Sequence, residues 1–285
     1  MLHALSRALR PWIPLVALVS IAGCTDDDDD ANFEGPDFPT GPGRIYSVQA
    51  VDFNTVDGVS VTASYGRIPV SGSHPVVILV HQVGIPEAHQ EWLSSGVFEA
   101  LLEEGYNVLA LDLRGHGGSS LPADGRANNV LLVEDLEDMH LEVRGAVTWL
   151  RTQSSADNAR MAVVGNSIGG NVAYVSMGAF PEDLQAGIAL SPGFWDEELQ
   201  PLVIGSGIEP FTPHSILYVV GEDDLVPISD TEALSYAGFA SELALVTDNS
   251  SLQVFTGESS HGLALLQAPE TKTLRLILDW LQTHL

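Results

Sequence analysis

The sequence predicts an α/β fold in which a mainly parallel sheet is covered by helices on both faces. Short apolar runs bounded by polar or turn residues are typical of strands buried on both faces; they are Val76–Val80, Val108–Leu111, Met161–Val164, Gly187–Leu190 and Ile216–Val220. Apolar residues at helical spacing predict helices between the strands and at the C-terminus; they are Leu93, Val97 and Leu101, then Leu136, Met139, Val143, Val147 and Leu150, then Leu274, Ile277, Leu278 and Leu281. This alternation favours right-handed crossovers, with ligands at the carboxyl ends of the strands.

The folded region is expected to open with a hairpin. Residues 45–68 alternate β-formers with polar residues, and Asp57-Gly58 between the two halves is a strong hairpin signal. The whole of 45–285 has the length of one α/β domain. We therefore expect a single domain in which two antiparallel strands precede the parallel sheet.

Negative charge dominates the composition. The chain of 285 residues has 11 basic and 38 acidic residues, which gives a formal net charge of −27. Such a charge opposes binding to nucleic acid and to a bare anionic membrane surface. We expect neither partner, and the simplest role of the charge is solubility.

The first 23 residues have the layout of an export signal. Arg7 and Arg10 precede an apolar run from Trp12 to Ala22, which is too short to span a bilayer. The run ends in Ile21-Ala22-Gly23-Cys24, which resembles a bacterial lipobox. The resemblance implies that Cys24 is lipidated on its sulfur and becomes the first residue of the mature chain, which anchors the protein to a membrane. Cys24 is also the only cysteine, so the domain has no internal disulfide.

A spacer is expected to follow the anchor. Residues 24–44 are poor in aliphatic side chains and rich in Asp, Pro and Gly, a composition that does not repay the entropy of ordering. We expect an extended tether rather than a calcium loop, because the run of aspartates lacks spaced ligands. In Gram-negative bacteria an aspartate directly after the lipidated cysteine resembles an inner-membrane retention signal. Here Thr25 separates Cys24 from Asp26, which favours the outer membrane if the cell is Gram-negative.

The strongest chemical signal is a G-x-S-x-G pattern. Gly165, Ser167 and Gly169 stand directly after the predicted strand Met161–Val164 and before an apolar helical stretch. Small residues allow a sharp strand-to-helix turn that presents the serine hydroxyl above the sheet. Ser167 is therefore the candidate nucleophile, in preference to an inert helix cap.

A serine nucleophile needs a base, and the base needs an orienting acid. The predicted strand Ile216–Val220 is followed by Asp223 and Asp224, and His261 lies on a loop after the β-like run Leu252–Phe255. We expect Asp224 to be the acid, with Asp223 as the alternative, and His261 to be the base.

The chain resembles the α/β-hydrolase superfamily from about Ile45 to its end. The order Ser167, Asp224, His261 is the order of that family, and residues 112–119, Asp-Leu-Arg-Gly-His-Gly-Gly-Ser, are similar to its D-x-R-G-H-G-x-S loop. In the family such side chains fix loops, so His81, Asp112, Arg114 and His116 are interpreted as structural.

The resemblance also implies an oxyanion hole. His81-Gln82-Val83-Gly84 is similar to the family's His-Gly loop, although Gln82 stands where glycine is usual. By position, the backbone N–H groups of Val83 and Ile168 would stabilise a tetrahedral oxyanion. The acid loop departs from the family as well, since one residue fewer separates Asp224 from Pro227.

These residues predict a hydrolase that acts on carboxylic esters through an acyl-enzyme. No ligand spacing for a metal and no nicotinamide, flavin or phosphate loop is visible, so we expect no cofactor. The interval Ser191–Ser215 is too short for a large lid and contains Phe194, Trp195 and Phe211, which could edge a pocket for short or medium acyl chains. The alternatives are a peptidase, a dienelactone-hydrolase-like enzyme and a non-catalytic binding lipoprotein of the same fold.

Overall fold

A computed structural model describes residues 46–84, 88–123, 133–193, 207–227, 233–268 and 271–285. The predicted signal peptide, Cys24 and the acidic tether lie outside the described residues. Within these ranges no helix combines the length and the apolar character that a membrane crossing requires.

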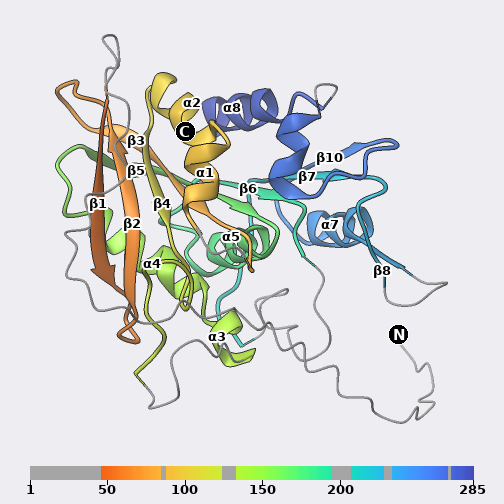
Figure 1. Ribbon diagram of the computed structural model, residues 1–285, viewed down its shortest axis with the longest axis horizontal. Coiled ribbons are helices and arrows are strands. Elements are labelled where there is room, and N and C mark those ends of the chain that lie inside the picture. The colour runs from red at the N-terminus through yellow and green to blue at the C-terminus, as the bar shows by residue number, and fades with distance from the viewer. Residues whose placement is uncertain (1–45, 85–87, 124–132, 194–206, 228–232, 269–270) are drawn as a thin grey trace, which may run out of the picture.

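The centre of the fold is an eight-stranded sheet with the order β1-β2-β4-β3-β5-β6-β7-β10 (Figure 1). Neighbouring strands from β4 to β10 run parallel, whereas β1 with β2 and β2 with β4 are antiparallel. The strands are β1 Ser47–Asn54, β2 Ser60–Arg67, β3 His74–Val80, β4 Asn107–Leu111, β5 Ala156–Asn166, β6 Ala186–Leu190, β7 Ile216–Gly221 and β10 Ser251–Phe255. Two short strands, β8 Leu225–Pro227 and β9 Ala233–Ser235, pair separately.

The predicted N-terminal hairpin is confirmed. Strands β1 and β2 pair from Ser47↔Arg67 to Asn54↔Ser60. Gly58 in the connection has φ +88°, a left-handed conformation that glycine adopts without steric cost. Every predicted parallel strand is also present, so the sequence located the sheet correctly.

Helices cover both faces of the sheet. Helices α1 Gln90–Ser94, α2 Val97–Glu103 and α8 Thr273–His284 pack on one face, and α4 His140–Leu150, α5 Ile168–Ala179 and α7 Tyr236–Leu245 pack on the other. Figure 1 shows α2 and α8 on the opposite side of the sheet from α4, α5 and α7. The remaining helical elements are α3 Val133–Glu137 and the 3₁₀ turn η2 Gly262–Gln267.

Two apolar stripes of the sequence are each divided between two helices. The stripe from Leu93 to Leu101 is divided between α1 and α2, because Gly96 between them has φ +81°. The stripe from Leu136 to Leu150 is likewise divided between α3 and α4. The acid loop leads to α7, which begins at Tyr236, with the hydroxyl of Ser235 accepting the N–H of Gly238.

The apolar strands supply two cores, one on each face of the sheet. In β3, Val76, Ile78 and Val80 face the core under α4, α5 and α7, whereas Val77 and Leu79 face the core under α1, α2 and α8. Side chains alternate between the faces of a strand, so a continuous apolar run satisfies both layers. Parallel pairing places the carboxyl ends of β3, β5, β6, β7 and β10 at the same end of the sheet, and the loops with the predicted site residues follow β3, β5, β7 and β10.

Candidate active site

The predicted nucleophile lies in a strained turn. Ser167 joins β5 to α5 with φ 55° and ψ −116°, a positive φ that non-glycine residues rarely adopt. The turn requires glycine on both sides. A Cβ at Gly165 would lie 1.8 Å from the carbonyl oxygen of Gly169, and one at Gly169 would lie 2.2 Å from the carbonyl oxygen of Val80. The predicted strand–turn–helix context of Ser167 is therefore present, with the serine partly exposed.

The structure pairs His261 with Asp224. The Nδ1 of His261 lies 2.9 Å from Oδ2 and 3.2 Å from Oδ1 of Asp224. Asp224 is buried, whereas the neighbouring Asp223 is exposed. Of the two acids that the sequence left open, Asp224 is the one in contact with the histidine. A carboxylate on Nδ1 favours the tautomer whose Nε2 is free to accept a proton.

Ser191, which the sequence analysis did not single out, supports this pair. It directly follows β6, and its Oγ donates to Oδ2 of Asp224 at 2.7 Å and accepts the N–H of Gly262 at 2.9 Å. The side chain is buried, and its φ of 43° is again positive. Ser191 thus joins the end of β6 to both the acid loop and the histidine loop. Its place at the end of a predicted strand was the only available signal.

Tyr236 also contacts the pair. Its ring centroid lies 4.4 Å from that of His261, and its backbone N–H donates to the carbonyl oxygen of Asp224 at 3.1 Å. Nothing in the sequence pattern distinguishes this tyrosine from any other first residue of a helix. Its contacts depend on the tertiary structure alone.

Contacts between their neighbours bring the elbow and the histidine loop together. Asn166, which precedes Ser167, accepts the backbone N–H of Leu263 through Oδ1 at 3.1 Å. Gly262 packs so closely here that a Cβ would lie 1.8 Å from the same oxygen. The residue before the predicted nucleophile therefore touches the residue after the predicted base. The side chain of His261 is 30% exposed, so the imidazole is accessible from solvent.

The predicted oxyanion loop lies beside the same turn. The carbonyl of Val80 packs against Gly169 near the start of α5, which places the end of β3 next to Ile168. Among the described residues, no hydrogen bond occupies the N–H of Val83 or of Ile168. A free N–H at each of these positions is what an oxyanion hole needs.

His81 fixes the direction of this loop. Its Nδ1 donates to the carbonyl of Gln82 at 2.6 Å, and its Nε2 accepts the N–H of Leu113 at 2.9 Å, which defines a neutral tautomer. Burial, with a smaller contribution from the nearby His116, lowers the pKa of His81 to about 4. A histidine in this state is a structural clamp, as predicted, and is not positioned to shuttle protons near neutral pH.

The loop after β4 is held by buried polar contacts. Asp112 accepts the ring and backbone N–H groups of His89 at 2.6 and 2.8 Å and the N–H of Gly118 at 2.9 Å. Arg114 pairs with Glu142 through Nε at 2.7 Å, and both side chains are completely buried. Buried charges need partners, and these pairs supply them. The structural interpretation of Asp112 and Arg114 agrees with these contacts.

One aromatic residue does not lie where the sequence analysis expected it. Phe211 packs edge-on against Tyr174, with 5.6 Å between ring centroids, and against Gly178 near the end of α5. Because the rise of an α-helix is about 1.5 Å per residue, Gly178 lies roughly 15 Å along the helix from Ile168. Phe211 therefore does not edge a pocket at Ser167. Phe194 and Trp195 lie outside the described residues.

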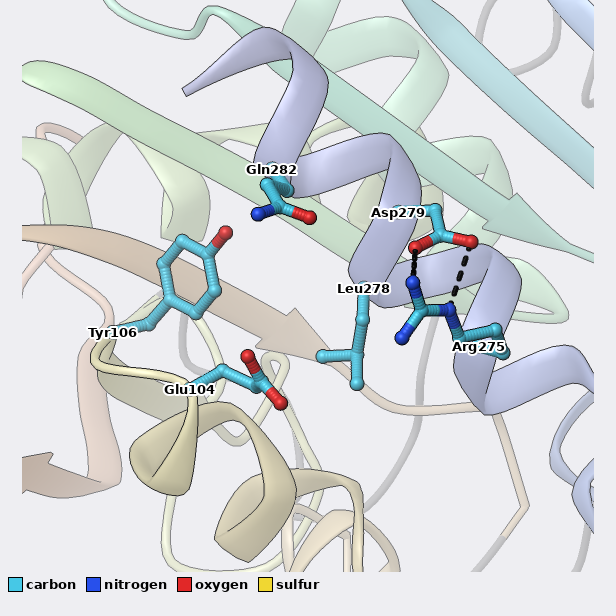
Figure 2. A pocket seen from close by; sticks show the side chains of 6 residues that line it. All are labelled: Glu104, Tyr106, Arg275, Leu278, Asp279 and Gln282. Carbon is cyan, nitrogen blue, oxygen red and sulfur yellow. Dashed lines mark hydrogen bonds and ion pairs between the residues drawn. The ribbon is translucent and has the colours of Figure 1, made fainter.

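A separate polar hollow lies at the opposite end of the sheet, where the parallel strands begin. It is lined by Glu104, Tyr106, Arg275, Leu278, Asp279 and Gln282, and Figure 2 shows the ion pair between Arg275 and Asp279 on its α8 wall. Tyr106 directly precedes β4, so the hollow is at the amino ends of the parallel strands and not at Ser167. Within the described ranges, no group of three or more His, Cys, Asp or Glu side chains is arranged to hold a metal ion.

Comparisons with known proteins agree with this architecture. The family model described as serine aminopeptidase, S33, matches residues 73–220, slightly more than half of the chain. An esterase of Pyrococcus furiosus superposes with a TM-score of 0.60 at 21% identity, covering 84% of this chain and 92% of the esterase. A dienelactone hydrolase from Anabaena variabilis gives a TM-score of 0.57 at 17% identity, covering 85% and 100%. At these identities the two structures show a shared fold.

One relative identified by sequence matches less than half of this chain. Dipeptidyl peptidase family member 6 of Caenorhabditis elegans is 28% identical over 132 residues, which is 46% of this chain. The match spans only 17% of that longer protein. The parallel sheet, the elbow at Ser167 and the family match together show that the chain has an α/β-hydrolase fold and belongs to the serine aminopeptidase S33 family.

Proposed function

We propose that the protein is a serine hydrolase that cleaves carboxylic esters through an acyl-enzyme on Ser167. The observation that carries this proposal is the contact between His261 Nδ1 and the buried Asp224, on loops that meet the elbow of Ser167. In this mechanism Ser167 attacks the ester carbonyl, and His261 accepts its proton and returns it to the leaving alcohol. Asp224 orients the imidazole and stabilises its protonated form. Water then repeats the sequence to release the acid.

The tetrahedral intermediates would be stabilised by the N–H groups of Val83 and Ile168. Both belong to backbone segments that are fixed by neighbouring contacts, Val83 after the His81 clamp and Ile168 at the first turn of α5. Preorganised donors of this kind are worth about 3 kcal/mol each in other enzymes. The N-terminus of α5 adds a favourable dipole for negative charge at this position.

A peptidase is the second candidate, because the matching family model and the relative from Caenorhabditis elegans are described as peptidases. The same triad chemistry serves amides. A dienelactone-hydrolase-like activity rests on fold similarity alone, since Ser167 is not the cysteine usual for that family. A non-catalytic binding protein would have no need for the Asp224–His261 contact beside Ser167.

A panel of substrates separates these candidates. Purified protein from residue 45 onwards would be assayed with p-nitrophenyl acetate, butyrate, octanoate and palmitate and with aminoacyl p-nitroanilides. We expect the highest kcat/KM on acetate or butyrate and little turnover of the anilides. A clear optimum on palmitate would exclude the short-chain preference, and faster cleavage of the anilides would identify a peptidase.

We also propose that the protein is exported and anchored through lipid on Cys24, with the acidic residues 25–44 as a tether. The support is the sequence alone, because these residues lie outside the described part of the structure. Expression of the full chain in a bacterium with membrane fractionation tests it. We expect the protein in the membrane fraction and Cys24→Ala in the soluble fraction; equal membrane binding by both would refute lipid anchoring at Cys24.

A further inference from the structure

A single carboxylate oxygen bridges two parts of the candidate active site. The Oε1 atom of Glu91, on α1, accepts the backbone N–H of Gln82 at 2.9 Å and the side-chain Nδ2 of Asn166 at 3.1 Å. Gln82 directly precedes Val83 of the predicted oxyanion hole, and Asn166 directly precedes Ser167. One atom therefore fixes the spacing between the oxyanion loop and the nucleophile.

The bridge continues to the histidine loop. The other end of the Asn166 amide accepts the N–H of Leu263 at 3.1 Å, and the side chain of Asn166 is completely buried. Contacts thus run from Gln82 through Glu91 and Asn166 to Leu263. They connect the loop after β3, the end of β5 and the turn η2, which are the segments that hold Val83, Ser167 and His261.

The surroundings of Glu91 disfavour the ionised form of its carboxyl group. Its side chain is only partly accessible, and burial raises its pKa to about 7, although the hydrogen bonds from Asn166 and Gln82 oppose that shift. A carboxyl placed where ionisation is unfavourable costs folding free energy, which other residue types at this position would avoid. Its two hydrogen bonds both go to backbone or side-chain groups that adjoin the proposed catalytic residues.

We propose that Glu91 is a positioning residue, which holds the oxyanion loop and Asn166 at the separation that the reaction requires. The inference rests on the proposed function of Ser167, His261 and the N–H of Val83. Glu91 itself is not expected to contact the substrate. Its loss should therefore lower kcat through misplaced groups and leave KM nearly unchanged, since misplacement by about 1 Å can cost on the order of 10²-fold in rate.

The test compares three substitutions at one position. Glu91→Gln keeps an oxygen acceptor of the same length, Glu91→Leu removes the acceptor, and Glu91→Asp withdraws it by one methylene group. Glu103→Leu on α2 is the matched control, because Glu103 is an exposed carboxylate. Steady-state kcat and KM would be measured with p-nitrophenyl butyrate, together with thermal unfolding followed by circular dichroism.

We expect Glu91→Gln to keep kcat within about threefold of wild type and Glu91→Leu to lose roughly 10- to 100-fold, with KM within about threefold in both. If Glu91→Leu does not fold, Glu91→Asp replaces it, with an expected loss of at least about fivefold. An unchanged kcat in Glu91→Leu, or in Glu91→Asp if Glu91→Leu does not fold, overturns the proposal. A loss of kcat in Glu91→Gln as large as that in Glu91→Leu overturns it as well. A wild-type protein that is inactive on esters and anilides alike would instead refute the proposed function.

Discussion

Ser191 and His261 bind the same oxygen of one carboxylate. The hydroxyl of Ser191 donates to Oδ2 of Asp224 at 2.7 Å, and His261 Nδ1 contacts that oxygen at 2.9 Å. The carboxylate of Asp224 is therefore oriented by a residue at the end of β6 as well as by the histidine. Since Ser191 also accepts the N–H of Gly262, one buried hydroxyl aligns both partners of the pair.

Removal of this hydroxyl should weaken the pair without abolishing it. Ser191→Ala leaves the N–H of Gly262 without an acceptor, which should lower the free energy of unfolding by about 1–2 kcal/mol. The substitution also frees the carboxylate of Asp224 to rotate, so we expect a roughly 3- to 30-fold lower kcat on p-nitrophenyl butyrate. Ser215→Ala is the control, because Ser215 also has a positive φ but its hydroxyl accepts only from the exposed side chain of Asn249. Equal kcat in the two variants would remove Ser191 from the site.

The two neighbouring acids should behave very differently. Asp224→Asn retains the shape of the side chain but removes the charge that favours the protonated imidazole, so kcat should fall by at least about 10³-fold. Asp223→Asn alters an exposed side chain and should leave kcat within about twofold. Steady-state kinetics on an ester provides the measurement, and a greater loss in Asp223→Asn would reverse the assignment.

Glu91 predicts a pH-dependent difference in stability. Burial raises its pKa from 4.5 to about 7 in the folded state, so the folded protein binds this proton more tightly than the unfolded chain does. The resulting stabilisation of the protonated form is present below about pH 4.5 and is lost as the pH rises through about 7. The glutamine of Glu91→Gln cannot ionise. The free energy of unfolding of this variant, relative to that of wild type, should therefore increase by about 1–2 kcal/mol when the pH is raised from 5 to 8, after allowance for partial exposure.

Urea unfolding at the two pH values measures this gain. Glu103→Gln supplies the control, since it also replaces one carboxyl by an amide, on the exposed face of α2. A difference between Glu91→Gln and wild type that does not change with pH would show that Glu91 has an ordinary pKa.

The elbow should tolerate no side chain at Gly165. A Cβ there would lie 1.8 Å from backbone, which cannot move without separating α5 from β5. Gly165→Ala is therefore expected to lose at least about 3 kcal/mol of stability or to fail to fold. Gly238→Ala in α7 serves as control, because its nearest neighbour would be 3.6 Å away and the change should be neutral or slightly stabilising. Similar melting temperatures for both variants would contradict the packing at the elbow.

Local patterns were enough to predict most of the fold and part of the site. The apolar runs located the parallel strands, Asp57-Gly58 located the hairpin, and the G-x-S-x-G spacing located the turn at Ser167. Chain order gave Asp224 and His261, but choosing Asp224 over Asp223 required the direction of each side chain. That direction depends on how β7 ends, because a shift of one residue exchanges the buried and exposed faces.

The residues that the sequence did not reveal act across long distances in the chain. Glu91 and Asn166 are 75 residues apart, and Ser191 and Gly262 are 71 apart. Such contacts have no local periodicity or motif, since they form only when the sheet brings the loops together. Phe211 was misplaced for the same reason: an aromatic residue in a short connection can pack under either end of a helix, and here it packs under the end far from Ser167.

The central claim is that Ser167 is the nucleophile, and labelling with a fluorophosphonate probe tests it most directly. The probe would be applied to the folded wild-type protein, to Ser167→Ala and to His261→Ala, followed by mass spectrometry of the modified peptide. The account predicts one covalent adduct on Ser167 in the wild type, none in Ser167→Ala and a rate of labelling at least about 10²-fold lower in His261→Ala. A folded wild-type protein without an adduct, or an adduct that persists in Ser167→Ala, would contradict it.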